Sequence, residues 1–301
     1  LEEALQHLAR TDPGNAEWQR DVSIGLNKVG DLRRRSGDPA GALDAYAESL
    51  DIARALARTD PGNTEWQRDL TIGLERVGDL RLQTGDPEAA GAAYREGLAI
   101  RRRLVALDPG NTQWQRDLSA GLDRIGDMHR LAGELDAALA TYSEGLEITR
   151  TLLTTDPENP AWRRGVAVSL NRIGDLQGLT GDTDAALASY EEALAIARAL
   201  VDHDPGNTEW RHDVAFGLNR IGDLHLRADD REAALRAFED ALAIVRDLSG
   251  LDPQNALWQR DVAVNLNKIG YIQGLSGETA AALAAFREAT AIVRRLAGID
   301  P

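Results

Sequence analysis

Hydrophobic residues near the start of the chain recur with the period of an α-helix. At about 100° per residue, one arc roughly 120° wide collects five apolar side chains, which are Trp18, Val22, Leu26, Val29 and Leu32. The opposite arc, about 60° wide, holds Arg20, Ile24, Asn27 and Asp31. We interpret the first arc as the packing face and the second as a face turned away from the core. The pattern predicts an amphipathic helix.

This pattern returns every 48 residues along the chain. Tryptophan marks one position of the repeat, at Trp18, Trp66, Trp114, Trp162, Trp210 and Trp258. Another aromatic keeps the same period, at Tyr46, Tyr94, Tyr142, Tyr190, Phe238 and Phe286. Six repeats therefore cover residues 13–60, 61–108, 109–156, 157–204, 205–252 and 253–300. Residues 1–12 match the end of a preceding repeat, and we expect them to form part of a helix.

Residues that begin and end helices predict two helices in each repeat. Asn15 precedes the first helix, where its side chain can accept a hydrogen bond from an unpaired backbone N–H. Gly37 supplies the left-handed residue that ends this helix, and Asp38-Pro39 begins the second. The fifth repeat has Asp229 at the glycine position, and aspartate tolerates a positive φ. Each helix is expected to span about 20 residues, or about 30 Å.

The repeat resembles a lengthened tetratricopeptide repeat (TPR). The family's sequence of large apolar, glycine, small and aromatic residues is matched by Leu26, Val29, Gly30, Ala42, Tyr46 and Ser49. The fourth repeat matches it with Leu170, Ile173, Gly174, Ala186, Tyr190 and Ala193. The aromatic residue that the family places three residues after the glycine is replaced, by Arg33, Arg81 or Gln177. The closing proline also arrives about seven residues late, which adds two turns to each helix.

The resemblance implies an all-α fold, a right-handed α-solenoid of six helix-turn-helix repeats. It also implies that the first helices line a concave surface, on which asparagines hold the backbone of a peptide. An asparagine amide can donate and accept at once, which suits a peptide bond. The expected ligand-binding residues are Asn27, Asp31, Asn171, Asp175, Phe216, Asn219, Asp223, Asn267 and Tyr271. The alternative is a solvated face on which Asn, Asp and Arg contact one another within each helix.

Two aromatic residues depart from the repeat on this face. Phe216 replaces an aliphatic residue and Tyr271 replaces an aspartate. Exposed aromatics are the usual anchors of a binding surface, so a diagonal pair could flank one extended peptide. Tyr271 has two alternatives, since it could instead face a neighbouring chain or the end of the array, or have no role.

Composition narrows the partner. The formal charge of −15 argues against nucleic acid, which needs clustered Lys and Arg, and favours a neutral or basic protein or peptide. In the expected groove, Asn27 is followed by Asp31 and Glu75 by Asp79. We expect these acidic residues to repel a carboxylate of a ligand. Cysteine is absent, which excludes thiolate chemistry and leaves the compartment open, with the cytoplasm favoured. No apolar run approaches the roughly 20 residues of a membrane helix, so no membrane partner is expected.

The sequence contains none of the catalytic or metal-binding motifs that we sought. The five histidines have no metal-ligand spacing, and the acidic residues recur in every repeat instead of forming one local pair. We therefore expect no cofactor, no metal and no enzyme. The leading hypothesis is a scaffold that binds proteins or peptides, used as the sensor or docking segment of a larger protein, in a repeat style that resembles bacterial arrays. The second is a structural or filament-forming solenoid that associates through uncapped ends, because the last repeat would expose an apolar face.

Overall fold

The computed structural model describes residues 14–298, and every regular element in that range is an α-helix. The first six are α2 (Ala16–Arg35), α3 (Pro39–Thr59), α4 (Thr64–Gln83), α5 (Pro87–Leu107), α6 (Thr112–Leu131) and α7 (Leu135–Thr155). The next six are α8 (Pro160–Thr180), α9 (Thr183–His203), α10 (Thr208–Arg227), α11 (Arg231–Leu251), α12 (Ala256–Leu275) and α13 (Thr279–Leu296). The predicted all-α fold of consecutive helix-turn-helix pairs is confirmed. The partial helix expected at residues 1–12 lies outside the described residues.

The helices begin and end where the sequence predicts. The side chain of Asn15 accepts a hydrogen bond from the backbone N–H of Trp18 at 3.1 Å, which caps α2. The carboxylate of Asp38 does the same for α3, from the N–H of Gly41 at 2.9 Å. At the turn between the two helices of the fifth hairpin, Asp229 has a positive φ of 60°, and its glycine counterparts also have positive φ values, such as 81° at Gly37. Side-chain caps therefore set the start of most helices, although Glu278 makes no such bond at the start of α13.

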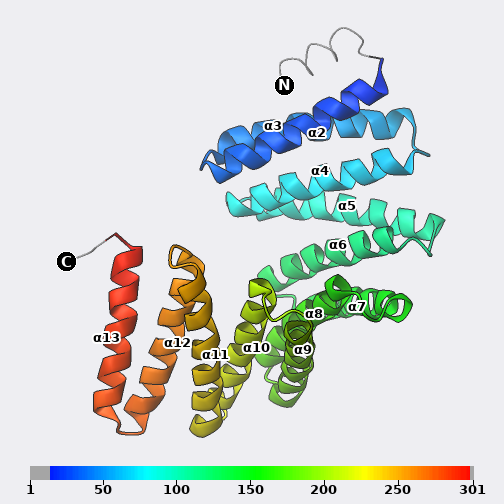
Figure 1. The fold of residues 1–301 in the computed structure, drawn as a ribbon. Coiled ribbons are helices and arrows are strands. Elements are labelled where there is room, and N and C mark those ends of the chain that lie inside the picture. The colour runs from blue at the N-terminus through cyan, green and yellow to red at the C-terminus, as the bar shows by residue number, and fades with distance from the viewer. Residues whose placement is uncertain (1–13, 299–301) are drawn as a thin grey trace. The chain divides into compact units, whose positions relative to one another are not determined.

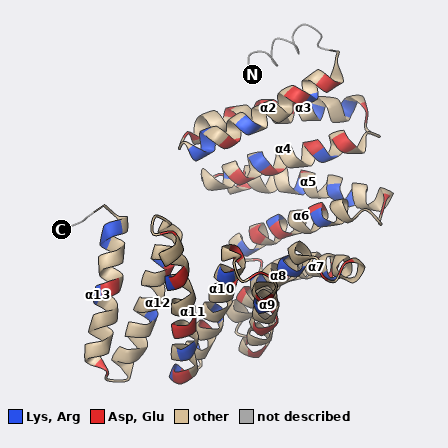
Figure 2. Ribbon diagram, viewed as in Figure 1, with Lys and Arg blue, Asp and Glu red and all other residues tan. Residues whose placement is uncertain are grey.

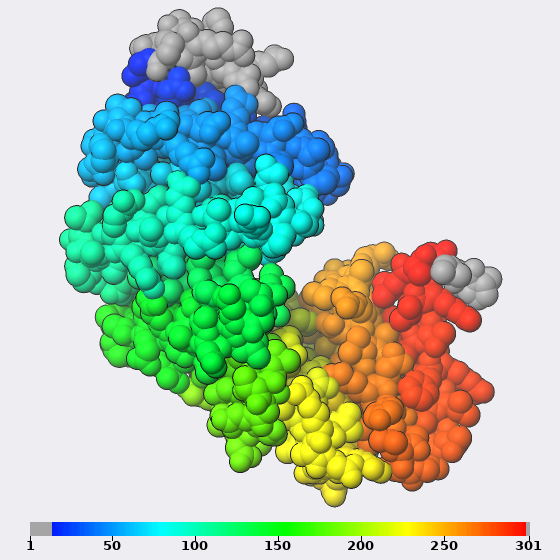
Figure 3. All heavy atoms as spheres, turned by 180° about the vertical axis from the view of Figure 1, so that it is seen from behind, coloured from blue at the N-terminus to red at the C-terminus, as the bar shows by residue number. Residues whose placement is uncertain are grey.

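The chain divides into two compact units, residues 1–152 (unit 1) and residues 153–301 (unit 2). Unit 1 contains the hairpins α2–α3 and α4–α5 together with α6 and most of α7, and unit 2 contains α8–α9, α10–α11 and α12–α13. Within each unit, the second helix of one hairpin packs on the first helix of the next, as α3 does on α4 and α11 on α12 (Figure 1). Within each unit, the filled surfaces of neighbouring hairpins meet directly in Figure 3.

A ladder of aromatic rings forms the centre of each hairpin. Tyr46 is 2% exposed and Phe238 is fully buried. Gly30 makes room for the ring of Tyr46, because a Cβ atom at Gly30 would lie 2.4 Å from it. These glycines therefore allow the two helices of a hairpin to approach closely, as the sequence predicts.

Two side chains of the predicted packing face are less buried than expected. The tryptophans, such as Trp114, are only partly buried, because the first turn of each first helix lies at the end of the hairpin. Leu32 is 60% exposed, whereas its equivalent Leu80 is 1% exposed. Leu80 packs on Tyr46 of the preceding hairpin, and no preceding hairpin covers Leu32 within residues 14–298.

Candidate functional site

The first helices of each unit share one face, which carries the residues that the sequence singles out. We call it the first-helix face; in unit 2 it comprises Val168, Asn171, Phe216, Asn219, Val264 and Asn267, on α8, α10 and α12. Figure 2 shows acidic and basic residues on the first helices α4 and α6 of unit 1, whereas α12 of unit 2 is largely uncharged. The arrangement of these charges decides what the face can bind.

One row of ion pairs links each first helix to the next within a unit. Arg20 reaches Asp69 at 2.6 Å, and Arg68 reaches Asp117 at 2.6 Å. In unit 2 the matching pairs are Arg164 with Asp213 at 2.5 Å and His212 with Asp261 at 2.7 Å. These side chains are mostly covered, so the pairs hold neighbouring hairpins in register.

The repeated aspartate forms a second row and has an internal role. Asp31 accepts a hydrogen bond from the hydroxyl of Tyr46 at 2.6 Å and pairs with Arg76 of the next repeat at 2.5 Å. Burial opposes ionisation of Asp31, but the bonds from Arg76 and Tyr46 outweigh it and lower the pKa of Asp31. The hydroxyl of Tyr190 likewise donates to Asp175 at 2.5 Å.

The other predicted aspartates also form ion pairs with basic residues of the next first helix. Asp175 also pairs with Arg220 at 3.2 Å, and Asp223 pairs with Lys268 at 2.7 Å. The carboxylates expected to repel an acidic ligand are thus neutralised by cations of the adjacent helix. Their contribution to ligand binding stays a prediction.

The asparagines of the first-helix face differ in whether their side-chain amides form hydrogen bonds within the protein. The buried Oδ1 atoms of Asn27 and Asn171 have no hydrogen-bond partner among the described residues. Asn219 is engaged, because its Nδ2 donates to the carbonyl of Ala215 at 3.1 Å and its Oδ1 accepts from Lys268 at 3.5 Å. Asn267 is exposed and forms no hydrogen bond within residues 14–298. Of these amides in unit 2, Asn267 is therefore the exposed one without a hydrogen bond, and Asn171 keeps an unpartnered but buried oxygen.

Phe216 lies at the rim of an apolar cavity. Its side chain is 39% exposed, and the guanidinium of Arg220 lies 4.8 Å from the ring centroid, which fixes the ring on one side. The cavity, of about 260 Å³, is lined by residues of α8, α9 and α10 that include Val168, Asn171, Leu194, Ala197, His212 and Phe216. The sequence selected Phe216 and Asn171, whereas Val168 and His212, which lie on the same predicted arc at the positions of Ile24 and Arg20, were not selected.

Tyr271 lies apart from this cavity. It is 53% exposed on α12, at the position that aspartate occupies in the five preceding repeats. The paired aromatic of its hairpin is Phe286, which has no hydroxyl to donate. The structure therefore does not bring Phe216 and Tyr271 to one cavity, and the anchoring role of Tyr271 stays untested.

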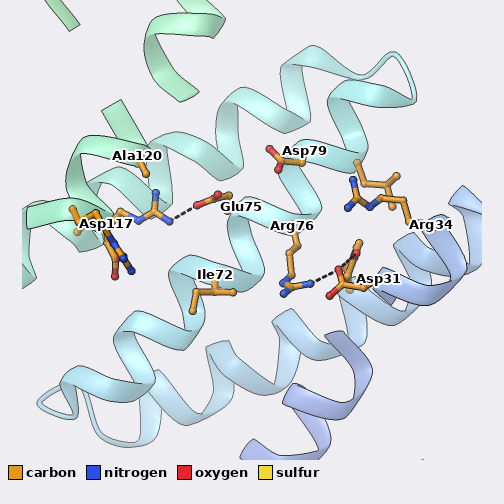
Figure 4. A pocket seen from close by; sticks show the side chains of 12 residues that line it. Asp31, Arg34, Ile72, Glu75, Arg76, Asp79, Asp117 and Ala120 are labelled. Carbon is orange, nitrogen blue, oxygen red and sulfur yellow. Dashed lines mark hydrogen bonds and ion pairs between the residues drawn. The ribbon is translucent and has the colours of Figure 1, made fainter. Parts of the chain in front are cut away.

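Unit 1 has a larger and more polar cavity on its own first-helix face, of about 510 Å³ (Figure 4). At its centre, Glu75 pairs with Arg101, which comes from the second helix α5 and is 6% exposed. Arg124 also reaches Glu75, at 3.3 Å. Burial opposes ionisation of Glu75, but Arg101 and Arg124 outweigh it and lower the pKa of Glu75.

One repeat alone does not show the role of Arg101. A comparison of equivalent positions in all six repeats does indicate it. The equivalent residues of the other repeats are Ala53, Thr149, Ala197, Val245 and Val293, and only the repeat of Arg101 has glutamate at the position of Glu75. Two departures in one repeat, of opposite charge, indicate a compensating pair.

The described residues contain no group of three or more His, Cys, Asp or Glu able to hold a metal ion. None of their helices is long and apolar enough to cross a bilayer.

Models of the tetratricopeptide repeat match residues 117–199 and residues 218–255. The chain therefore contains tetratricopeptide repeats. The resemblance inferred from the glycine, small and aromatic positions is thus confirmed. The general function that these repeats support is that of a protein-interaction scaffold.

Solved structures share the fold of this TPR chain. BtubC (BKLC) from P. vanneervenii is 22% identical with a TM-score of 0.66, over 86% of this chain and 92% of that one. The S. pombe nuclear import adaptor Nro1 is 11% identical with a TM-score of 0.59, over 94% and 95%. The apo form of RapI is 12% identical with a TM-score of 0.58, over 92% and 99%. At these identities the likeness concerns the fold alone. No curated protein matches the sequence.

Proposed function

We propose that this TPR scaffold binds a peptide segment of another protein on the first-helix face of unit 2. The observation that carries the proposal is Phe216, a half-exposed aromatic at the rim of an apolar cavity. Aromatic residues beside a pocket are the usual anchors of a protein interface, because they bring large contact area for little rotamer entropy. Asn171 lines the same cavity, and its buried Oδ1 has no hydrogen-bond partner among the described residues.

The charges of the protein favour a neutral or basic partner. The chain carries a formal charge of −15, which attracts basic molecules over long range and repels acidic ones. At short range the aspartates of the face are paired with Arg220 and Lys268, so a neutral peptide meets no unpaired carboxylate there. Such a scaffold suits the docking segment of a larger protein, which holds a partner without changing it.

A displayed peptide library selected on the purified chain tests this function. Selected peptides should bind Phe216→Ala at least about tenfold more weakly, as for other aromatic anchors, while the melting temperature stays nearly constant. Tyr271→Asp is the matched control, because it restores the residue of the other repeats outside the cavity. Undiminished binding to Phe216→Ala would place the contact surface elsewhere and refute the proposal.

A second candidate function, end-to-end association, has its own observation. On α13, Leu283 is 47% exposed and Val293 is 49% exposed, and Phe286 is 37% exposed where its equivalent Phe238 is fully buried. This apolar face matches the one that α11 buries against α12. Light scattering across a concentration series tests it: Leu283→Glu with Val293→Glu should abolish any association, and a monomer at all concentrations would refute it.

A further inference from the structure

We propose that the polar cavity of unit 1 binds the acidic side chains of a second ligand, an extended peptide segment rich in Asp and Glu. This site is separate from the Phe216 cavity of unit 2 and does not depend on the function proposed there. The inference follows from an interruption in the row of ion pairs, from the balance of charges in the cavity and from two arginines that have no partner.

The row of ion pairs between first helices is interrupted at Arg116. Arg20, at the equivalent position, bonds Asp69 of the next repeat at 2.6 Å. The residue that corresponds to Asp69 in the repeat after Arg116 is Gly165, whereas the five other repeats have aspartate there. Arg116 forms no ion pair and no side-chain hydrogen bond within the described part of the chain. Its guanidinium is therefore free to bond a carboxylate from another molecule.

The cavity of unit 1 holds more guanidinium groups than carboxylates. Four carboxylates line it, and each bonds a different arginine. The pairs are Asp31 with Arg76, Glu75 with Arg101, Asp79 with Arg124 and Asp117 with Arg68. Two further arginines, Arg34 and Arg116, also line the cavity and have no such partner among the described residues. The cavity therefore has two uncompensated positive charges, in a chain whose formal charge is −15.

The acids of the cavity are held by bonds to other groups, so they do not neutralise these two arginines. Asp31, for example, accepts from Arg76 at 2.5 Å and from the hydroxyl of Tyr46 at 2.6 Å. Arg34 and Arg116 are both exposed. A carboxylate of a ligand would therefore replace water at these two side chains and would not have to break an ion pair of the protein.

The positions of the two arginines favour an extended ligand with several carboxylates. Figure 4 shows Arg34 and Asp117, the residue after Arg116 on α6, at opposite ends of the cavity, with Glu75 and Arg76 between them. A single small anion can therefore bond only one of the two unpaired arginines. The planar donors of a guanidinium match a carboxylate, which is also the group that the equivalent arginines bond within the protein.

The test measures, by isothermal titration calorimetry, the binding of blocked peptides to the full chain at low salt. The acidic probe is acetyl-(Glu-Ala)₄-amide, and the neutral control is acetyl-(Gln-Ala)₄-amide, which has nearly the same shape. Neither peptide has a terminal charge, so only side-chain carboxylates distinguish them. Citrate is the third probe, because it is a small anion with carboxylate groups.

We expect the acidic peptide to bind at least about tenfold more tightly than the neutral one and than citrate. Arg34→Gln with Arg116→Gln should weaken its binding at least about tenfold, while the melting temperature stays nearly constant because neither arginine loses an internal partner. Arg260→Gln is the matched control. Arg260 is the exposed equivalent of Arg116 in the last repeat and also has no ion-pair partner in the described residues, but it lies outside this cavity.

Four results would overturn the proposal. These are no binding of the acidic peptide up to about 1 mM, equal binding of the neutral peptide, unchanged binding in the double arginine variant, and citrate binding as tight as that of the peptide. Phe216→Ala should leave the acidic peptide unaffected, and a loss of binding there would place the peptide on unit 2 and refute the site in unit 1. Because the function proposed for unit 2 is tested through Phe216 and this site through Arg34 and Arg116, either can fail without the other.

Discussion

Units 1 and 2 are built from the same repeat but differ on their first-helix faces. In unit 1 the cavity is polar and centres on Glu75 and the buried guanidinium of Arg101. In unit 2 the equivalents are Asn171 and Ala197, and the cavity is apolar and bordered by Phe216. Both units keep the rows of ion pairs between hairpins. The scaffold and the binding surface are therefore separable, because a few substitutions change the cavity without altering the contacts that hold the hairpins together.

The two units also differ in whether their departures from the repeat are compensated. Arg101 fits because Glu75 supplies its counter-charge and because Gly121 leaves room, since a Cβ at Gly121 would lie 2.8 Å from the guanidinium. In unit 2, Phe216 has Arg220 against its ring. Glu75 and Arg101 are therefore a compensated pair of departures, whereas Phe216 is a single departure that lies against the arginine ordinary at its position.

The largest expected effect follows from removing the charge that compensates Arg101. Glu75→Ala should destabilise unit 1 by about 3–5 kcal/mol, because it leaves a buried cation without its carboxylate partner. Asn171→Ala, the substitution at the equivalent position of unit 2, should cost less than about 1 kcal/mol. Urea unfolding gives the free energies, and hydrogen exchange in α4–α6 against α8–α10 locates the change.

A double variant sharpens this contrast. Glu75→Asn with Arg101→Ala introduces the residues of unit 2 and should recover most of the lost stability, since a buried ion pair exchanged for neutral groups is often close to neutral. Equal losses for the double variant and for Glu75→Ala alone would show that Glu75 acts through contacts other than Arg101.

A smaller effect is expected at the aromatic ladder. The hydroxyl of Tyr94 donates to Asp79 at 2.7 Å, and burial together with this bond raises the pKa of Tyr94. Tyr94→Phe should therefore cost about 1–2 kcal/mol by removing a partner from a covered carboxylate. Phe238→Tyr in unit 2 would add the missing hydroxyl near Asp223 and should be neutral or stabilising by up to about 1 kcal/mol. Thermal unfolding of both variants measures the difference, and a clear loss in Phe238→Tyr would mean that the ring has no room for the oxygen.

The smallest effect is a pH dependence confined to unit 2. The hydrogen bond to Asp261 raises the pKa of His212, against the effect of burial, with help from the charges of Asp261 and Asp213 and opposition from Arg164. A raised pKa means that protonation stabilises the folded state. This stability is fully present below the ordinary histidine pKa of about 6.5 and is lost as the pH rises through the higher folded value.

The expected size is about 1 kcal/mol or less, because the pair is partly exposed. Urea midpoints should fall between about pH 6 and pH 8 in the wild-type chain. His212→Arg restores the residue that unit 1 has at Arg68 and should remove the dependence. A persistent dependence in His212→Arg would assign it to another histidine.

The fold was largely predictable, while the candidate site was predictable only in part. Asn15, Asp38 and Gly37 act within a few residues of themselves, so their effect on helix boundaries can be inferred without a structure. The departure of Phe216 from the repeat was also visible, because it needs only a comparison of equivalent positions in the sequence. The cavity that Phe216 borders and Tyr271 does not reach was not predictable, because a cavity depends on how neighbouring helices pack.

The sequence by itself determined the repeat, the two helices of each hairpin and the buried aromatic ladder, since local capping and a strict period leave few alternatives. Only the tertiary structure decided which polar groups are free. The partner of Asp31 is Arg76, 45 residues away, and the partner of Arg20 is Asp69, 49 residues away. Long side chains reach across hairpins in this way only when helix spacing and rotation allow it. That geometry occupies Asp31, Asp175 and Asp223 and leaves Phe216 available to a ligand.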